Sequence, residues 1–282
     1  MPDTPAVPSH ALTDGSSIPA IGFGTYPLEG QEGVDAVVSA LQVGYRLIDT
    51  AVNYGNEEEV GEAIRRSGVP REELVVTSKL PGRDHGYDET LRSIRGSLER
   101  LGLDHLDLHL IHWPNPSVGR YREAWRALVA ARDEGLVRSP GVSNFTEAQL
   151  VEVVADTGVT PVANQVELHP AFPQAHMREV HARLGIRTES WSPLGERQAL
   201  LGRSAVSDPA TRYGVTGTQV VLRWHVQLGA VPLPKSADPQ RQRQNLDVFG
   251  FELDVEEVAT LSALARPDGR LFDGDPETHE EM

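Results

Sequence analysis

Short apolar runs alternate with amphipathic stretches along most of this 282-residue chain, and most of the runs end in a polar residue. The runs are rich in Val, Ile and Leu and too short for helices, a pattern typical of buried strands. The predicted strands are Arg46–Asp49, Leu74–Lys79, Leu106–His112, Val137–Ser143, Val162–Glu167, Arg187–Trp191 and Ala230–Pro232, with one more near Ile21.

Between the predicted strands, apolar residues recur at the spacing of amphipathic helices. Thr146 and Asp238 are suitable residues to begin two of these helices, because their side chains can cap free backbone amides. The predicted helices are Gly33–Val43, Glu57–Ser67, Asp88–Leu101, Arg120–Glu134, Glu147–Ala155, Gln174–Leu184, Thr216–Leu228 and Pro239–Asn245. Ahead of them, the stretch from His10 to Ala20, with a turn at Asp14-Gly15, predicts an N-terminal β-hairpin.

Eight strand–helix units imply a parallel sheet, and units of this length suit closure into a (β/α)8 TIM barrel. No stretch is rich enough in Gly, Ser or Pro to link two domains, so residues 1–282 are expected to form one domain. A doubly wound open sheet is the alternative. Gly22-Phe-Gly24 resembles the start of a dinucleotide fingerprint, but Pro27 stands where its third glycine belongs, so we interpret it as a turn at the barrel entrance.

The two ends of the chain, residues 1–9 and 273–282, are expected to be flexible. The first is rich in proline and has neither the basic nor the apolar region of a signal peptide. The second is an acidic tail, for which a solvated end is preferred over a binding role. The C-terminal loop of the barrel is expected to be short.

Charge and composition narrow the functional classes. The formal net charge of −15 disfavours non-specific binding to nucleic acid or to anionic membranes, so an anionic ligand must meet a local positive cluster. The absence of cysteine excludes disulfides and thiolate chemistry, and the 10 histidines lack the paired spacing of metal ligands. No apolar run approaches the roughly 18 residues of a membrane span. We expect a soluble, cytoplasmic protein without a metal, and a monomer by default.

Polar or aromatic residues stand at the ends of the predicted strands, where the reactive groups of barrel enzymes gather. They are Asp49, with Tyr54 in the loop that follows, Lys79, His112, Ser143 with Asn144, Gln165, Trp191 and Lys235. Because the carboxyl ends of parallel barrel strands meet at one face, we expect these side chains to surround one pocket.

Four of these residues could together donate a proton to an oxygen. A free tyrosine, with a pKa of about 10, is a poor acid or base near neutral pH. The Lys79 cation is expected to lower the pKa of Tyr54, and Asp49 to hold the lysine in place. A neutral His112 can donate a hydrogen bond to a substrate oxygen. The set suits protonation of an oxygen while a hydride reaches the adjacent carbon.

Seven stretches, in order and at family spacing, make the chain resemble the aldo-keto reductases from about Leu12 to Leu264. They are GYRLIDTAVNY at 44–54, TSK at 77–79, LIHWP at 110–114, GVSNF at 141–145, NQVE at 164–167, WSPL at 191–194 and PKS at 234–236. The resemblance implies NADPH-dependent carbonyl reduction and a catalytic tetrad of Asp49, Tyr54, Lys79 and His112. Many relatives have tyrosine at the position of Trp191. A tryptophan at this position makes the chain resemble the bacterial 2,5-diketo-D-gluconate reductase-like branch of the family.

The resemblance also implies how the cofactor would be held. The implied contacts of its nicotinamide end are Ser143, Asn144 and Gln165 on the carboxamide, Trp191 stacked on the ring, and Ser192 and Leu194 nearby. At the end of the cofactor opposite the nicotinamide, the family pattern is matched by Lys235, Ser236, Arg241 and Asn245. The side chains of Lys235 and Arg241 would pair with a 2′-phosphate. They supply the positive cluster that an anionic ligand requires, which favours NADPH over NADH.

The substrate is less determined by the sequence. Tyr26 and Trp113 are expected to line an apolar, aromatic mouth. The loop from Gly195 to Ser204 is short, which suggests an open site for small aldehydes, dicarbonyls or keto sugars. Two other functions fit the fold: a cofactor-binding barrel that acts as a regulatory or structural subunit, and a barrel enzyme for phosphorylated sugars that uses no nicotinamide.

Overall fold

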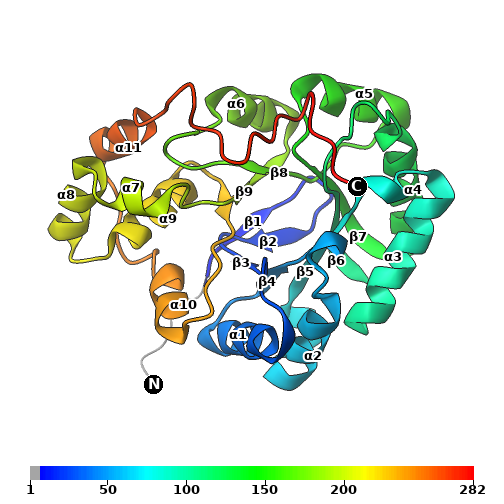
Figure 1. The fold of residues 1–282 in the computed structure, drawn as a ribbon, viewed down its shortest axis with the longest axis horizontal. Coiled ribbons are helices and arrows are strands. Elements are labelled where there is room, and N and C mark those ends of the chain that lie inside the picture. The colour runs from blue at the N-terminus through cyan, green and yellow to red at the C-terminus, as the bar shows by residue number, and fades with distance from the viewer. Residues whose placement is uncertain (1–6) are drawn as a thin grey trace.

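Eight parallel strands form the centre of the fold and follow one another around it in chain order (Figure 1). The computed structural model describes residues 7–282. The strands are β3 (Phe23–Gly24), β4 (Leu47–Asp49), β5 (Val75–Leu80), β6 (Leu106–Ile111), β7 (Val137–Ser143), β8 (Ala163–Glu167), β9 (Arg187–Trp191) and β10 (Val231–Pro232). Gly22 N donates to Pro232 O at 3.0 Å and Gly24 N to Pro234 O at 3.2 Å, which closes the predicted (β/α)8 barrel.

The eight predicted helices surround the strands (Figure 1). They are α1 (Gly30–Val43), α2 (Glu57–Ser67), α3 (Tyr87–Leu101), α4 (Tyr121–Asp133), α5 (Glu147–Thr157), α6 (Ala175–Leu184), α9 (Gly217–Gln227) and α10 (Pro239–Leu246). Thr146 and Asp238 cap α5 and α10 as predicted, since each side chain accepts hydrogen bonds from amides of the first turn.

Three further helices and three short 3-10 turns were not predicted. They are α7 (Arg197–Leu201), α8 (Ser204–Tyr213), α11 (Val255–Ser262), η1 (Val52–Tyr54), η2 (Arg71–Glu73) and η3 (Gly82–Asp84). Pro209 lies inside α8, and proline inside an apolar periodic segment usually argues against a helix. Residues 195–204, for which the sequence predicts a short loop beside an open site, contain α7 and the first residue of α8.

The glycine pair near the start of the chain belongs to the barrel wall. Phe23–Gly24 is the first barrel strand, so the interpretation of this segment as an entrance turn is wrong. A Cβ at Gly22 would lie 2.6 Å from side-chain atoms of Leu233 and Leu47. Glycine is needed here because the first and last strands approach each other closely.

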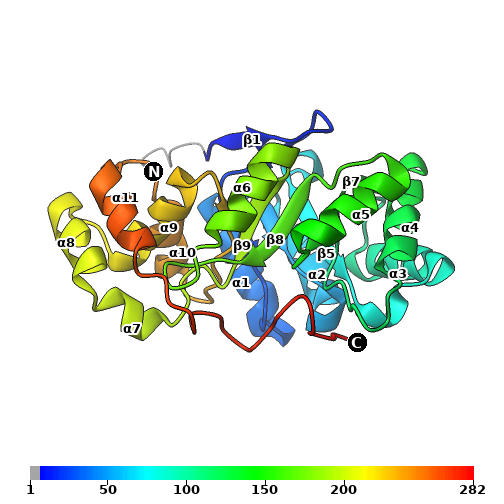
Figure 2. The same cartoon turned by 90° about the horizontal axis from the view of Figure 1, so that it is seen from above.

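The predicted hairpin covers the N-terminal end of the barrel (Figure 2). Its strands are β1 (Ser9–Ala11) and β2 (Ser17–Pro19), which pair antiparallel with His10 opposite Ile18. Gly15 in the turn has φ +86°, a conformation that favours glycine. The hairpin inserts Ile18 among the apolar side chains that fill this end of the barrel: Leu47, Leu108, Leu110, Val162, Ala163, Val231 and Leu233.

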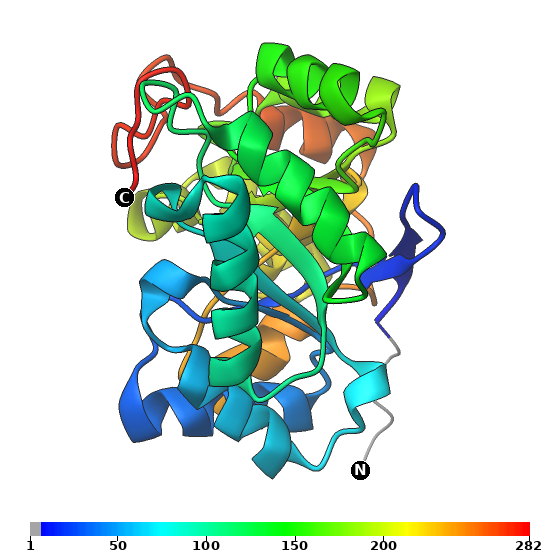
Figure 3. The same cartoon turned by 90° about the vertical axis from the view of Figure 1, so that its right-hand side faces the viewer.

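Residues 266–282 cross the opposite end of the barrel (Figures 2 and 3). Arg266 N donates to Ala171 O at 3.0 Å, and Leu271 N donates to Glu167 Oε1 at 2.6 Å. The sequence predicts a solvated, flexible end at 273–282, whereas the structure places these residues in contact with the barrel face, where loop groups bind their backbone and carboxylates. Within residues 7–282, no helix is both long enough and apolar enough to cross a membrane.

Candidate active site

A buried ion pair lies at the C-terminal end of the barrel. Lys79, on β5, is 0% exposed, and its Nζ donates to Asp49 Oδ2 at 2.7 Å, to Thr50 O at 2.9 Å and to the Tyr54 hydroxyl at 3.3 Å. These three acceptors match the three protons of an ammonium group. Burial alone lowers the pKa of Lys79, but the charges and hydrogen bonds of Asp49 and Tyr54 together outweigh it and the pKa is raised, so the lysine stays charged.

Tyr54 reaches this pair from η1, in the loop after β4. Asn56 holds the loop in place: it accepts from Thr50 Oγ1 at 2.6 Å and donates to Leu28 O at 2.9 Å. Burial raises the pKa of Tyr54; Lys79 lowers it and Asp49 raises it further. The expected lowering of the pKa is therefore wrong in its net direction, because burial disfavours the phenolate more than the lysine favours it. Tyr54 keeps its proton at neutral pH.

His112 completes the predicted group of four. It follows β6, and its ring centroid lies 5.7 Å from that of Tyr54, edge to face. Asn144 Nδ2 donates to His112 O at 3.0 Å and so fixes the backbone that carries the histidine. The structure thus brings together Asp49, Tyr54, Lys79 and His112, which the sequence places on three separate segments.

The predicted nicotinamide contacts also lie side by side. Asn144 has φ +62°, its Nδ2 donates to Ser143 Oγ at 3.0 Å and its Oδ1 accepts from Trp191 Nε1 at 2.8 Å. Ser143 Oγ donates to Gln165 O at 2.8 Å, and Gln165 Nε2 donates to Asp49 Oδ1 at 2.8 Å. One hydrogen-bonded chain therefore joins these side chains to the ion pair.

Glu189 is a buried acid that sequence reasoning missed. It lies on β9, and its Oε2 accepts from Gln165 Nε2 at 3.4 Å while its Oε1 has no partner within the described residues. Burial, followed by the charge of Asp49, raises the pKa of Glu189 to about 8, so the carboxyl is protonated at neutral pH. A glutamate in the middle of a predicted buried strand is the signal that could have found it.

A cavity of about 600 Å³ lies over these groups. Its lining includes the predicted residues Tyr26, Asp49, Tyr54, His112, Trp113, Asn144, Gln165, Trp191, Ser192, Leu194 and Lys235. Tyr26 stands at the rim, 62% exposed, with its ring centroid 5.1 Å from that of Tyr54. The cavity has the aromatic mouth that the sequence predicts.

The remaining predicted residues lie on and before α10. Ser236 is buried, and its Oγ accepts from Asp238 N at 3.1 Å. Asn245 is buried in the last turn of the helix, whereas Arg241 is exposed in its first turn, with Nε 3.7 Å from Asp238 Oδ2. The exposed guanidinium and Lys235 at the cavity edge are the cations that the sequence assigns to a phosphate.

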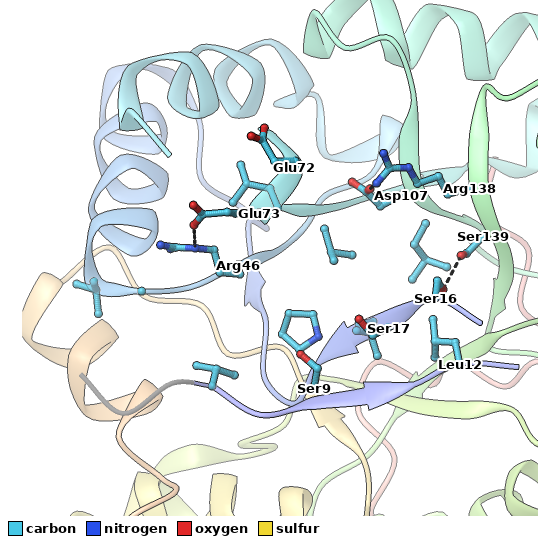
Figure 4. A pocket seen from close by; sticks show the side chains of 18 of the residues that line it. Ser9, Leu12, Ser16, Ser17, Arg46, Glu72, Glu73, Asp107, Arg138 and Ser139 are labelled. Atoms are coloured by element: carbon cyan, nitrogen blue, oxygen red, sulfur yellow. Dashed lines mark hydrogen bonds and ion pairs between the residues drawn. The ribbon is translucent and has the colours of Figure 1, made fainter. Parts of the chain in front are cut away.

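A second cavity of about 710 Å³ lies at the hairpin end of the barrel (Figure 4). Four of its five charged lining residues form two pairs: Arg46 Nε is 3.1 Å from Glu73 Oε2, and Arg138 Nη1 is 2.9 Å from Asp107 Oδ1, while the fifth is Glu72. None of the predicted site residues lines it. Within residues 7–282, no three histidine, aspartate or glutamate side chains gather as a metal site would require.

The model of the Aldo/keto reductase family matches residues 20–266, and the chain belongs to this family, which makes it an oxidoreductase. It is 61% identical over 278 residues to 2,5-diketo-D-gluconic acid reductase B of Corynebacterium sp. (strain SHS752001), covering 99% of this chain and 100% of that protein. An aldo-keto reductase of Mycolicibacterium smegmatis is 45% identical over 271 residues, 96% of this chain and 98% of its own.

Solved structures agree with this assignment. Gox0644 in its apo form has a TM-score of 0.93 at 42% identity, over 98% of this chain and 99% of that one, and a mutant of it has been solved in complex with NADPH. An aldo-keto reductase of Bombyx mori in complex with NADP has a TM-score of 0.89 at 35% identity, over 98% of each chain.

Proposed function

We propose that this chain reduces small aldehydes and ketones, including dicarbonyls and keto sugars, to alcohols with NADPH, and that Tyr54 donates the proton. The observation that carries the proposal is the contact chain from Asp49 through Lys79 to the Tyr54 hydroxyl, with steps of 2.7 and 3.3 Å, below one cavity. A phenol beside a buried cation is suited to donate a proton to a developing alkoxide, because the cation stabilises the phenolate that remains.

The residues around the cavity fit a nicotinamide dinucleotide. Gln165 uses its amide nitrogen on Asp49, which leaves its amide oxygen for a carboxamide, with Ser143 and Asn144 beside it. Trp191 offers an aromatic face at the cavity wall. Ser236 and Asn245 frame the start and end of α10, where Lys235 and Arg241 suit a phosphate better than a neutral ribose. When bound, the cofactor supplies the hydride.

Each of the four residues Asp49, Tyr54, Lys79 and His112 has a separate role in the proposed reaction. The Tyr54 hydroxyl and His112 would hold the substrate oxygen between them and polarise the carbonyl. Because the pKa of Tyr54 is raised, the hydroxyl keeps its proton until negative charge develops on that oxygen. Lys79 then stabilises the phenolate that remains, and Asp49 keeps the ammonium group in position.

A substrate screen tests the proposal. NADPH absorbance is followed with a panel of aldehydes, ketones and keto sugars, including 2,5-diketo-D-gluconate, which the name of the 61% identical relative suggests. Consumption of NADPH with a carbonyl substrate supports the proposal. Tight NADPH binding with no turnover on the whole panel would favour a regulatory or structural barrel, and the absence of saturable NADPH fluorescence quenching would favour a barrel enzyme without nicotinamide.

Replacement of Tyr54 tests its role as the proton donor. Tyr54→Phe should lower turnover about a thousandfold, because the substrate oxygen loses its acid. NADPH binding, measured by fluorescence quenching, should stay unchanged, since the ring is retained and only the hydroxyl is removed. A variant that retains more than a few per cent of turnover would exclude Tyr54 as the donor.

We further propose that the protein works in the cytoplasm as a monomer. A chain of 282 residues without cysteine suits a reducing compartment. The site supports a monomer because its predicted groups all come from one barrel.

A further inference from the structure

The segment 271–282, called here the strap, is attached on both sides of the cavity mouth. On one side, Leu271 N donates to Glu167 Oε1 at 2.6 Å, an oxygen that also lies 2.9 Å from His169 Nε2. On the other, Asn115 Nδ2 donates to Glu281 O at 2.5 Å. Anchors at the end of β8 and in the loop after β6 hold the strap across the face of the barrel (Figure 3).

The middle of the strap packs on the two tryptophans of the mouth. The His279 ring centroid lies 4.1 Å from that of Trp113, and Phe272 lies 6.4 Å from Trp191 with its ring plane 30° away. A Cβ at Gly274 would lie 2.8 Å from Trp113 Cη2, so only glycine allows this approach without a shift. The strap therefore contacts both tryptophans of the mouth, Trp191 at Phe272 and Trp113 at Gly274 and His279.

Glu281 carries a charge from the strap into the cavity. Its Oε1 lies 2.8 Å from His112 Nδ1, its side chain is 18% exposed, and it lines the same cavity as Tyr54 and Trp113. Burial raises the pKa of Glu281, but the contacts with His112 and Asn53 and the charge of Lys79 together outweigh burial and the pKa is lowered. The carboxylate is consequently ionised at neutral pH, next to the position proposed for the substrate oxygen.

Little positive charge in the cavity opposes this carboxylate. Among the described residues that line the cavity, Lys235 is the one lysine or arginine, and it stands at the edge beyond β10. Lys79 lies below the cavity and is already bound to Asp49 at 2.7 Å. A second anion that enters beside His112 would approach the Glu281 carboxylate, which lies 2.8 Å from the His112 ring.

We propose that Glu281 is a specificity-determining residue that favours uncharged carbonyl substrates over those with a carboxylate next to the reacting carbon. The inference deepens the proposed carbonyl reduction and rests on it. Two like charges enclosed in one partly solvated cavity repel enough to change binding about tenfold. The discrimination acts on the KM of the acid, because Glu281 neither gives nor takes the reacting proton.

The test compares one charged and one uncharged substrate with the same keto group. The ratio of kcat/KM for ethyl pyruvate to that for pyruvate is measured with saturating NADPH in the wild type and in Glu281→Gln. We expect the ratio to fall about tenfold in the variant, mainly through the KM of pyruvate. The ester reacts intrinsically faster or slower than the acid to the same extent in both proteins. This difference therefore cancels when the ester-to-acid ratio of the variant is compared with that of the wild type.

Glu280→Gln is the matched control. It removes the same charge from the same strap, but its carboxylate accepts from Ser117 N at 2.7 Å on the exposed loop and does not line the cavity. The ester-to-acid ratio should stay unchanged in this variant. An equal fall in both variants would mean that net charge alone sets the preference and would overturn the proposal.

Gly82→Ala separates the charge of Glu281 from its position. A Cβ at residue 82 would lie 2.1 Å from Glu281 O, so the strap must move while its carboxylate is retained. The ratio should fall here as well. If Glu281→Gln changes ester and acid equally, Glu281 only supports the strap and the proposal fails. If neither substrate nor any other carbonyl is reduced, the proposed function itself fails.

Discussion

The two ends of the barrel both carry charged residues around a cavity, but they hold those charges differently. At the hairpin end, the charges form pairs such as Arg138 with Asp107, 2.9 Å apart, and the arginine is largely exposed. At the strap end, Lys79 and Asp49 are both buried, and their pair extends to the hydroxyl of Tyr54. At the strap end the buried ion pair contacts a hydroxyl that faces the cavity and can release a proton, whereas at the hairpin end the buried Asp107 is held by Arg71 and Arg138.

The difference shows why size does not identify the site. The hairpin-end cavity, about 710 Å³, is larger than the strap-end cavity, about 600 Å³. Charges that neutralise one another in contact with water mainly hold elements together. A charge enclosed with a titratable partner changes what that partner can do chemically, and this coupling is the better mark of an active site.

The largest contrast between the two ends is expected from removal of Lys79. Lys79→Met should lower turnover about a thousandfold, because the Tyr54 phenolate loses its stabilising cation. It should also lower the free energy of unfolding by about 3–5 kcal/mol, since Asp49 is left buried without its partner. Steady-state kinetics and urea unfolding measure the two effects.

A double variant separates these effects. Adding Asp49→Asn to Lys79→Met removes the unpaired charge and should restore much of the lost stability, but not the turnover. If Lys79→Met keeps turnover within tenfold of the wild type, turnover does not depend on the buried ion pair. The proposed functional difference between the two ends of the barrel would then be wrong.

At the hairpin end, loss of a charge should affect stability alone. The Asp107 carboxylate binds Val76 N at 2.9 Å, Arg71 at 2.7 Å and Arg138 at 2.9 Å. Asp107→Asn should lower the free energy of unfolding by about 2 kcal/mol, because an amide cannot accept all of these bonds. The kcat/KM should stay within about twofold of the wild type.

Asp133→Asn is the matched control for Asp107→Asn. Asp133 also pairs with an arginine, Arg132, at 2.8 Å, but its side chain is 66% exposed, so its loss should cost less than about 0.5 kcal/mol. A marked fall of kcat/KM in Asp107→Asn, with no such fall in the control, would show that the two ends of the barrel are coupled.

The smallest effect is expected from Glu189, as a dependence of stability on pH. Its pKa is raised to about 8 in the folded protein, against an ordinary value near 4.5. Between these values the folded chain holds a proton that the unfolded chain has released, so stability falls as pH rises toward 8. Glu189→Gln should remove roughly 1–2 kcal/mol of this fall between pH 6 and 8.

Urea unfolding of wild type and Glu189→Gln at pH 6, 7 and 8 measures that dependence. The two proteins should differ in the slope of stability against pH rather than in stability at one pH. Parallel slopes would mean that Glu189 is ionised in the folded state and that the strap end encloses more negative charge than we infer.

The barrel and the central residues of the site could be predicted because both depend on local patterns. Each strand is a short apolar run, and Asp49, Lys79 and His112 stand at or next to the ends of such runs. Once the strands are parallel and closed into a barrel, their ends must meet, so strand-end residues converge without any knowledge of distances.

The strap and the state of the buried acids could not be predicted in this way. Residues 273–282 are acidic and carry no periodic pattern, and their place depends on partners such as Asn115 and Ser117 that lie far away in the chain. The net pKa of Tyr54 depends on the balance between burial and two opposite charges. The charged residues can be identified from the sequence, but the extent to which the fold buries Tyr54 cannot.

The positions of the tryptophans make intrinsic fluorescence sensitive to the mouth of the barrel. Of the 4 tryptophans, Trp125 and Trp224 are 0% exposed, away from the site cavity, while Trp113 and Trp191 line that cavity beneath the strap. Since Trp191 also donates to Asn144 at 2.8 Å, its emission depends on both the polarity and the hydrogen bonding of the site. Intrinsic fluorescence therefore contains a component that reports on the mouth alone, without a dye or an added label.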